Sequence, residues 1–264
     1  MYCKFLIQAR IGSTRFPQKI LTDIYNNLNL IDIVYNRLLV SKKVNTSDIV
    51  VLTTNNEKDN ILVNYLKNNN IEYYRGDEKN VHGRFYKYLL QLNPKPQFFF
   101  RICADNPFIE PLFIDEMFDF IKKDKNNNID YISYHTKEKL PAILTHYGFF
   151  CEMIKYDSFI DSLKFVNEYC VNNNCNDYKE HVTPAFYKTK YFNSTFLEMP
   201  EVLNKKNLRL TFDSAGDYEV VKLIYNKLNT LNFNYLDVLK IIDGDKKLIG
   251  KMKKNIIQNT KQIN

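Results

Sequence analysis

The sequence contains no tryptophan, and it has only seven glycines, eight prolines and five cysteines among its 264 residues. The cysteines are odd in number and never spaced as CxxC. This argues against a disulfide scaffold or a zinc site and favours a reducing, cytoplasmic location. Cys103 and Cys151 lie in apolar runs and are expected in the core, whereas Cys170 and Cys175 flank an asparagine-rich run and are spaced for a loop pair.

Long apolar runs are also absent. No run approaches the roughly 18 apolar residues that a membrane-spanning helix needs, so we expect no membrane segment. The apolar stretch at the N-terminus is too short for a signal peptide and leads directly into a charged motif. The net charge of +7 is compatible with nucleic acid, an acidic surface or a small anionic substrate. Because the basic residues are not interleaved with aromatic residues as in a nucleic-acid-binding module, we expect no nucleic-acid partner.

Apolar runs and amphipathic stretches alternate along the first half of the chain. Buried strands are predicted at 4–9, 48–54, 71–76 and 97–102, and helices at 29–44, 57–70, 81–92 and 111–125. This order predicts an α/β fold of three layers, Rossmann-like, in which helices cover both faces of a mostly parallel, mixed sheet. In such sheets ligands bind at the carboxyl ends of the strands.

The second half is less regular. Strands are predicted at 130–136, 191–199 and 208–214, a short helix interrupted by Pro184 at 179–188, and an amphipathic helix at 215–229. Ser214 and Asp217 are spaced for a capping box at the start of that helix. The last basic stretch predicts an exposed helix within 241–264. No linker divides the chain, so we expect one domain over 1–264.

A cationic loop follows the first predicted strand. Residues 8–21 read QARIGSTRFPQKIL, with Gly12 and Ser13 between Arg10, Arg15 and Lys19. Glycine lets a backbone approach a ligand closely, and three cations can neutralise a triphosphate. The pattern is neither a Walker A loop nor GxGxxG. A surface loop with ordinary cations is the alternative interpretation.

Two aspartates are predicted at the ends of two other strands. Asp105 follows the apolar run in RICADNPFIEP, and Asp213 follows LRLTF. Carboxylates at strand ends suit Mg²⁺, which proteins hold by one or two carboxylates together with substrate phosphates. Each aspartate alone could equally cap a backbone N–H in a turn. With the cationic loop at a third strand end, a nucleotide–metal site becomes the better interpretation.

Four motifs occur in an order that resembles one family: QARIGSTRFPQKIL, RICADNPFIEP, EHVTP at 180–184 and LRLTFDSAGD at 208–217. The resemblance covers about residues 4–230. It is to the cytidylyltransferase family of the spore-coat polysaccharide biosynthesis type, whose relatives include the CMP-Kdo and CMP-sialic acid synthetases. It implies a nucleotidyltransferase fold, Mg²⁺ as cofactor, and transfer of CMP from CTP to an acceptor with release of pyrophosphate.

The resemblance also implies roles for individual residues. Nucleotide-binding residues are Gln8, Ala9, Arg10, Gly12, Ser13, Arg15, Lys19, Thr54, Arg75, Arg84 and Asp105, of which Lys19, Arg10 and Asp105 are catalytic, and the metal ligands are Asp105 and Asp213. Candidate acceptor contacts are His146, Tyr147, Glu152, Glu180 and His181. Between 139 and 152 the chain departs from the family pattern, which makes the acceptor the least transferable inference. His82 and His135 are expected at the surface.

The resemblance implies that residues 1–125 form a nucleotide-binding half and that residues 126–240 bind the acceptor and supply the second metal aspartate. Residues 241–264 are expected to form a basic C-terminal helix. The acceptor is a sugar acid or a related small anionic or sugar-like molecule, and relatives are often homodimers. Alternatives are GTP in place of CTP, a sugar or polyol phosphate acceptor, or an inactive nucleotide-binding regulator. The C-terminal helix lies outside the resemblance, so its removal is expected to leave the chemistry intact.

Overall fold

A central sheet organises the computed structural model, which describes residues 1–124, 126, 128–172 and 176–259. Within these residues seven strands form the sheet in the order β5-β4-β1-β6-β8-β7-β9. All strands run in one direction except β8, which is antiparallel to β6 and β7. The predicted mostly parallel, mixed sheet is therefore confirmed.

The sheet strands are β1 (Cys3–Gln8), β4 (Ile49–Thr54), β5 (Tyr73–Gly76), β6 (Phe98–Cys103), β7 (Tyr131–His135), β8 (Glu152–Lys155) and β9 (Ser194–Glu198), and a separate hairpin is formed by β2 (Asp23–Tyr25) and β3 (Leu28–Asn29). The helices are α1 (Leu30–Leu38), α2 (Asn60–Asn68), α3 (Val81–Leu90), α4 (Pro111–Ile121), α5 (Tyr156–Asn172), α6 (Asn176–Glu180), α7 (Pro184–Lys188), α8 (Ala215–Leu228), α9 (Tyr235–Asp243) and α10 (Lys246–Asn259).

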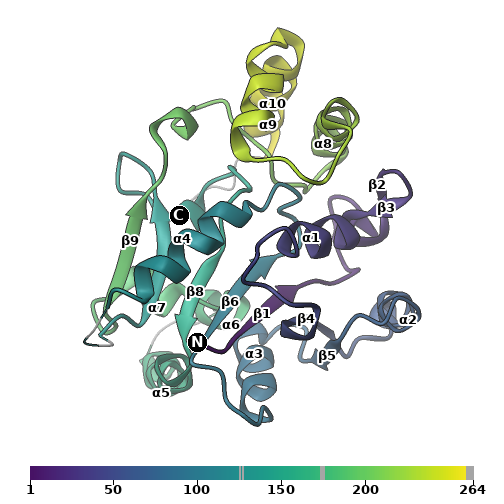
Figure 1. Ribbon diagram of the computed structural model, residues 1–264. Helices are drawn as coiled ribbons and strands as arrows, with labels where there is room; N and C mark the ends of the chain where they lie inside the picture. Colours follow the sequence, from purple (N-terminus) through teal and green to yellow (C-terminus); the bar gives the residue numbers. More distant parts are fainter. Residues whose placement is uncertain (125, 127, 173–175, 260–264) are drawn as a thin grey trace.

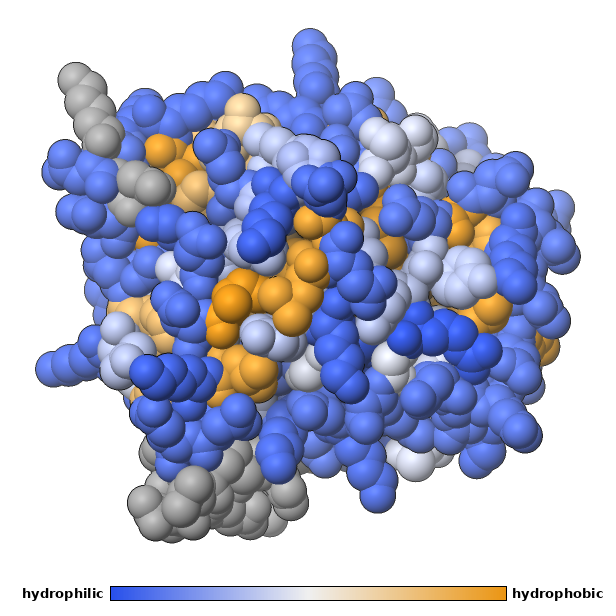
Figure 2. Space-filling view, turned by 90° about the horizontal axis from the view of Figure 1, so that it is seen from below, coloured by the Kyte–Doolittle hydropathy of each residue, from blue (hydrophilic) through white to orange (hydrophobic). Residues whose placement is uncertain are grey.

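Alternating side chains of the strands pack into two separate cores. Phe5 and Ile7 of β1 belong to the core under α1, α2, α4 and α8–α10, whereas Leu6 belongs to the core under α3, α5, α6 and α7. Helices therefore cover both faces and give three layers, with α8, α9 and α10 grouped at one end (Figure 1). The underside of the molecule is mainly hydrophilic, with apolar side chains emerging in patches (Figure 2).

Local sequence signals set several helix starts. The Ser214–Asp217 capping box at the start of α8 is present as predicted. The sequence predicted that Pro184 interrupts a helix, but in the structure Pro184 lies in the first turn of α7. A proline costs little there, because the N–H that it lacks would have no partner within the helix. In the described residues no helix is long and apolar enough to cross a membrane.

The predicted strand at 208–214 is wrong. Residues 208–213 pair with no strand in the described part of the chain. Their N–H groups bond to loops instead: Leu210 donates to the carbonyl of His146 and Phe212 to the carbonyl of Asp105, both at 2.8 Å. These two bonds place Asp213 beside the loop that follows β6.

Both histidines expected at the surface are buried. His82 on α3 is 1% exposed and lies against the Phe159 ring, with Nε2 2.9 Å from Ser162 Oγ. Burial lowers the pKa of His82 to about 4, so the ring is neutral. His135 is buried in β7, where its Nδ1 lies 2.6 Å from the carbonyl oxygen of Thr136.

A basic helix does form within 241–264, as α10, but it is not exposed on every side. α9 ends at Asp243, and α10 buries Leu248 and Met252 against the rest of the molecule. Cys151 is in the core as expected, whereas Cys103 is only half-buried. Cys170 and Cys175, whose spacing suggested a loop pair, lie outside the residues whose side chains the structure describes.

Candidate functional site

A cleft of about 690 Å³ opens where β1 and β6 end. It is lined by most of the residues that the sequence singled out: Gln8, Ala9, Arg10, Gly12, Ser13, Arg15, Lys19, Arg84, Asp105, His146, Glu180, His181 and Asp213. The register of the sheet pairs Gln8 with Cys103, so β1 and β6 end level with each other. The loops that follow them therefore meet over one cavity, as expected for parallel strands.

Lys19 joins the cationic loop to both aspartates. Its Nζ lies 3.0 Å from Asp213 Oδ1 and 3.5 Å from Asp105 Oδ2, and it donates to the carbonyl of Phe212 at 2.8 Å. Arg15 Nη2 lies 3.0 Å from the same oxygen of Asp213. The fold thus assembles groups as distant in sequence as Lys19 and Asp213, which are 194 residues apart, into one charged cluster. We call Arg10, Arg15, Lys19, Asp105 and Asp213 the cleft rim.

Charge pairing sets the protonation of the rim. Burial of Asp213 acts to raise its pKa, but Lys19, Arg15 and Arg209 together hold that pKa below its ordinary value. Burial likewise acts to lower the pKa of Lys19, and Asp105 and Asp213 outweigh it and raise that pKa. At neutral pH Asp213 is therefore a carboxylate paired with the Lys19 ammonium group.

The rim fits a divalent cation. Asp105 and Asp213 both approach the Lys19 ammonium, which shows that their carboxylates converge on positive charge. Among the described residues no three His, Cys, Asp or Glu side chains group as metal ligands. Two carboxylates completed by phosphate oxygens are the ligand set that Mg²⁺ prefers over an all-protein cage.

Gly12 is exposed at the mouth of the cleft. It does not have a positive φ, and a Cβ at this position would meet only Glu78 Oε1, at an ordinary 3.6 Å. Contacts within the chain therefore do not require glycine here. The space over the Gly12 backbone is open toward the cleft.

Arg84 is a buried cation that faces the cleft. It is 1% exposed, its Nη1 donates to the Asp77 carbonyl at 3.3 Å, and its Nε has no partner among the described residues. Burial and the nearby Arg10 lower the pKa of Arg84 to about 10. A buried guanidinium with an unmet N–H is costly, and an anionic ligand in the cleft would offset that cost.

Thr54 and Arg75 do not line the cleft but form hydrogen bonds that support the loop beside it. Arg75 donates from Nε to the Thr54 carbonyl at 2.8 Å, and the Thr54 hydroxyl donates to the carboxylate of Asp59. The same carboxylate accepts the N–H of Ile11 at 2.6 Å. Asp59, which is 2% exposed, thus holds the backbone of the cationic loop through the N–H of Ile11. The sequence analysis did not single out Asp59.

Tyr147 and Glu152, expected to contact the acceptor, also lie outside the cleft lining and are buried. Glu152 on β8 accepts from Arg101 Nη1 at 2.5 Å, Tyr131 at 2.6 Å and Thr183 at 2.7 Å. Antiparallel pairing places Glu152 directly beside Arg101 of β6. Its carboxylate is fully engaged within the protein.

Arg101 lines the bottom of the cleft and was not among the predicted residues. Its Nε and Nη2 donate to Gln8 Oε1 at 3.3 and 3.2 Å, so Glu152 orients Arg101 and Arg101 orients Gln8. A charged residue inside the apolar run FFFRIC was the signal that a buried ion pair was required. We call Gln8 and Arg101, which line the cleft, together with Glu152, which holds Arg101 from outside the lining, the cleft floor.

His146 enters the cleft from the segment that departs from the family pattern. Arg209 Nη1 lies 2.9 Å from its Nδ1. Because arginine cannot accept a hydrogen bond, Nδ1 is the acceptor and the ring carries its proton on Nε2. Arg209 itself is buried and, after Asp59 and Arg101, is a third residue that the sequence analysis did not single out.

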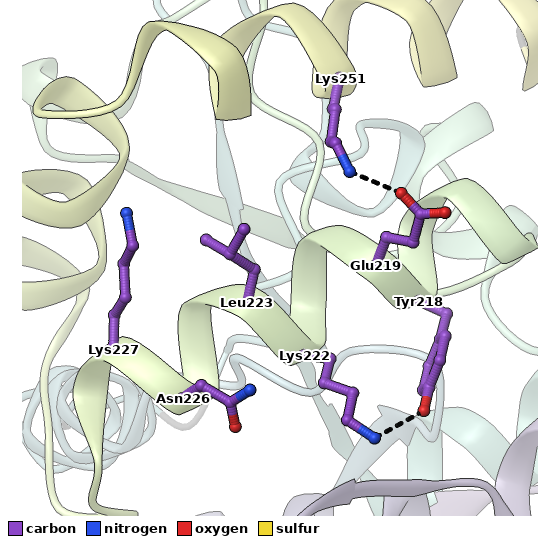
Figure 3. Close-up of a pocket in the computed structure, with 7 residues that line it drawn as sticks. All are labelled: Tyr218, Glu219, Lys222, Leu223, Asn226, Lys227 and Lys251. Carbon is purple, nitrogen blue, oxygen red and sulfur yellow. Dashed lines mark hydrogen bonds and ion pairs between the residues drawn. The ribbon is translucent and has the colours of Figure 1, made fainter.

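A second hollow lies between α8 and α10 and is lined by Tyr218, Glu219, Lys222, Leu223, Asn226, Lys227 and Lys251 (Figure 3). Lysines of this hollow are paired with acidic groups, as Lys251 is with Glu219 at 2.6 Å and Lys227 with Asp245 at 2.7 Å. None of the predicted site residues lines it. The cleft is therefore the candidate site.

Comparison with known proteins agrees with this geometry. Residues 4–200 match the model of the family described as Cytidylyltransferase, which is more than half of the chain. The chain belongs to the cytidylyltransferase family. It is 32% identical over 231 residues to the spore coat polysaccharide biosynthesis protein SpsF of Bacillus subtilis, covering 84% of this chain and 86% of that protein.

Solved structures share the fold of this cytidylyltransferase family member. A cytidylyltransferase from Leptospira borgpetersenii superimposes with a TM-score of 0.77 at 24% identity, covering 94% of this chain and 97% of the other. A CMP-2-keto-3-deoxy-manno-octonic acid synthetase, solved as a complex with CTP, gives a TM-score of 0.60 at 13% identity, with coverage of 86% and 100%. The predicted nucleotidyltransferase fold is confirmed.

Proposed function

We propose that this chain transfers CMP from CTP to a sugar acid or a related acceptor and releases pyrophosphate. The observation that carries the proposal is the position of Lys19, between Asp105 and Asp213 and beside Arg15, in a cleft at the ends of parallel strands. Membership of the cytidylyltransferase family and the fold shared with a CTP-bound synthetase support it.

The rim residues suit attack at the α-phosphorus. Arg10, Arg15 and Lys19 neutralise the triphosphate and the charge that develops on the leaving pyrophosphate. Such a displacement needs in-line alignment and no nucleophilic side chain. Asp105 and Asp213 would hold Mg²⁺, which when bound would supply Lewis-acid stabilisation of the phosphates.

We propose further that the two parts of the chain bind different substrates. Residues 1–125 bind the nucleotide, and 126–240 bind a small anionic or sugar-like acceptor through His146, Glu180 and His181, which all line the cleft. The similarity to a spore coat polysaccharide biosynthesis protein supports a role in surface glycan synthesis. We propose a cytoplasmic, homodimeric enzyme.

The decisive experiment measures pyrophosphate release with each of the four NTPs against a panel of sugar acids, sugar phosphates and polyol phosphates. We expect release with CTP, Mg²⁺ and a sugar acid. Release with GTP, or with a sugar or polyol phosphate, would replace the substrates but keep the reaction class. CTP binding without release from any acceptor in the panel would support a nucleotide-binding regulator instead.

A further inference from the structure

The C-terminal helix α10 contributes a buried polar group to its contact with α8. It lies beyond residues 4–200, the part that matches the family model, and the sequence suggested that it was dispensable. The structure instead buries Asn255 to 4% exposure where α10 crosses the start of α8. A buried side-chain amide needs a hydrogen-bond partner, and the partner of Asn255 is itself hydrogen-bonded to residues of the cleft.

That partner is Asp217. Asn255 Nδ2 donates to Asp217 Oδ1 at 3.2 Å. A Cβ at Gly216 would lie only 2.4 Å from Asn255 Oδ1, so the absence of a side chain at Gly216 lets α10 come this close. The contact is therefore built into both helices and does not depend on a flexible surface side chain.

Asp217 fixes the backbone that carries Asp213. Its Oδ2 accepts the N–H of Asp213 at 3.1 Å and the N–H of Ser214 at 3.0 Å. Its two oxygens also accept from Nε and Nη2 of Arg209 at 2.7 and 2.8 Å. Asp217 is 2% exposed, so these protein groups take the place of water around a buried carboxylate.

The network ends on two side chains of the cleft. Arg209 Nη2 donates to Asp213 Oδ2 at 3.3 Å, and Arg209 Nη1 donates to Nδ1 of His146 at 2.9 Å. The other oxygen of Asp213 faces Lys19 and Arg15. Asn255 is thus connected to the rim through one carboxylate and one guanidinium.

We propose that Asn255 is a positioning residue, which holds Asp217 so that the Asp213 carboxylate keeps the orientation needed to bind the metal–CTP complex. The inference rests on the proposed function, because it takes Asp213 as a metal ligand. It makes α10 a supporting element of the site. Partners of metal ligands act in this way in proteins generally, and their loss weakens metal binding about tenfold or more.

The test is calorimetric titration with CTP, in saturating MgCl₂ and again in EDTA, for the full-length protein and three variants. Asn255→Leu removes the donor, and Asn255→Asp keeps the shape but sets a carboxylate against Asp217. Lys251→Ala is the matched control, because it breaks the exposed ion pair with Glu219 between the same two helices (Figure 3). Urea unfolding of each variant checks that it is folded, and if Asn255→Leu does not fold, the isosteric Asn255→Asp carries the test.

We expect the Mg²⁺-dependent gain in CTP affinity to fall about tenfold in both Asn255 variants and to stay unchanged in Lys251→Ala. CTP affinity in EDTA should stay within about twofold of wild type. Unchanged Mg²⁺-dependent binding in the Asn255 variants overturns the inference and leaves the proposed function standing. Equal losses in Lys251→Ala, or an equal loss in EDTA, show general loosening and also overturn it. Absence of CTP binding by the wild type overturns the proposed function and the inference together.

Discussion

The rim and the floor of the cleft differ in how completely the protein satisfies their charges. On the rim, the side chains of Arg10, Arg15 and Asp105 keep 52%, 40% and 35% of their surface exposed, and Lys19 and Asp213, which pair with each other, keep 12% and 13%. On the floor, Arg101 and Glu152 keep 6% and 1%. Rim charges can exchange their partners for a ligand, whereas floor charges are already bound within the protein. Substitutions on the rim should therefore weaken function, and substitutions on the floor should weaken the fold.

The largest expected effect is on the floor. Glu152→Ala leaves Arg101 buried without its counter-ion and should lower the free energy of unfolding by about 4 kcal/mol in urea titrations. Glu78→Ala, which removes a half-exposed partner of Arg10, should change it by about 0.5 kcal/mol or less. Equal losses in the two variants would remove the distinction between floor and rim.

Asp105→Asn should show the opposite pattern. Its fold should be as stable as wild type, because the side chain is partly exposed, but the transition state should lose on the order of 3 kcal/mol, more than a hundredfold in turnover. The measurement is pyrophosphate release at saturating Mg²⁺ with the acceptor identified by the panel. Near-normal turnover would contradict the metal assignment.

His82 is buried like the floor residues, but it forms no ion pair with any residue that the structure describes. Its pKa of about 4 lies below the ordinary value near 6.5, so below pH 6.5 the unfolded chain binds a proton that the folded chain does not. Stability should thus be lost as pH falls through this window, by about 2 kcal/mol between pH 7 and pH 5. His82→Gln should remove that part of the loss in urea titrations at the two pH values. An unchanged pH dependence would contradict the buried, neutral state of His82.

The smallest expected effect belongs to the most exposed rim cation. Arg10→Ala should weaken CTP binding by about 1 kcal/mol at low salt, and less as salt rises, with no change in the free energy of unfolding. Calorimetry at two ionic strengths measures this. A loss of stability similar to that of Glu152→Ala would place Arg10 with the floor.

The sequence predicted the rim better than the floor for a physical reason. Rim residues lie in short motifs, and parallel strands bring their ends together, so Arg15, Lys19 and Asp105 could be grouped without coordinates. Asp213 does join this group, but the strand that was predicted to carry it does not form, and the Phe212–Asp105 backbone bond places it there instead. Floor residues meet through the reversed strand β8, which the pattern of the chain did not predict. Glu152 was therefore expected to contact the acceptor rather than Arg101.

Other errors also arise from long-range contacts. The segment 208–214 has the composition of a strand, but its N–H groups bond to the loops at His146 and Asp105. The burial of His82 depends on α5, which supplies both Phe159 and Ser162. Local propensity carries no information about such partners.

The most direct test of the account is an anomalous-scattering map from crystals grown with CTP and Mn²⁺. We predict a manganese peak coordinated by Asp105 and Asp213, with the triphosphate along the backbone of residues 10–19 and beside Lys19. A peak elsewhere in the molecule, or a triphosphate that does not contact this loop, would show that the rim is not the metal–nucleotide site.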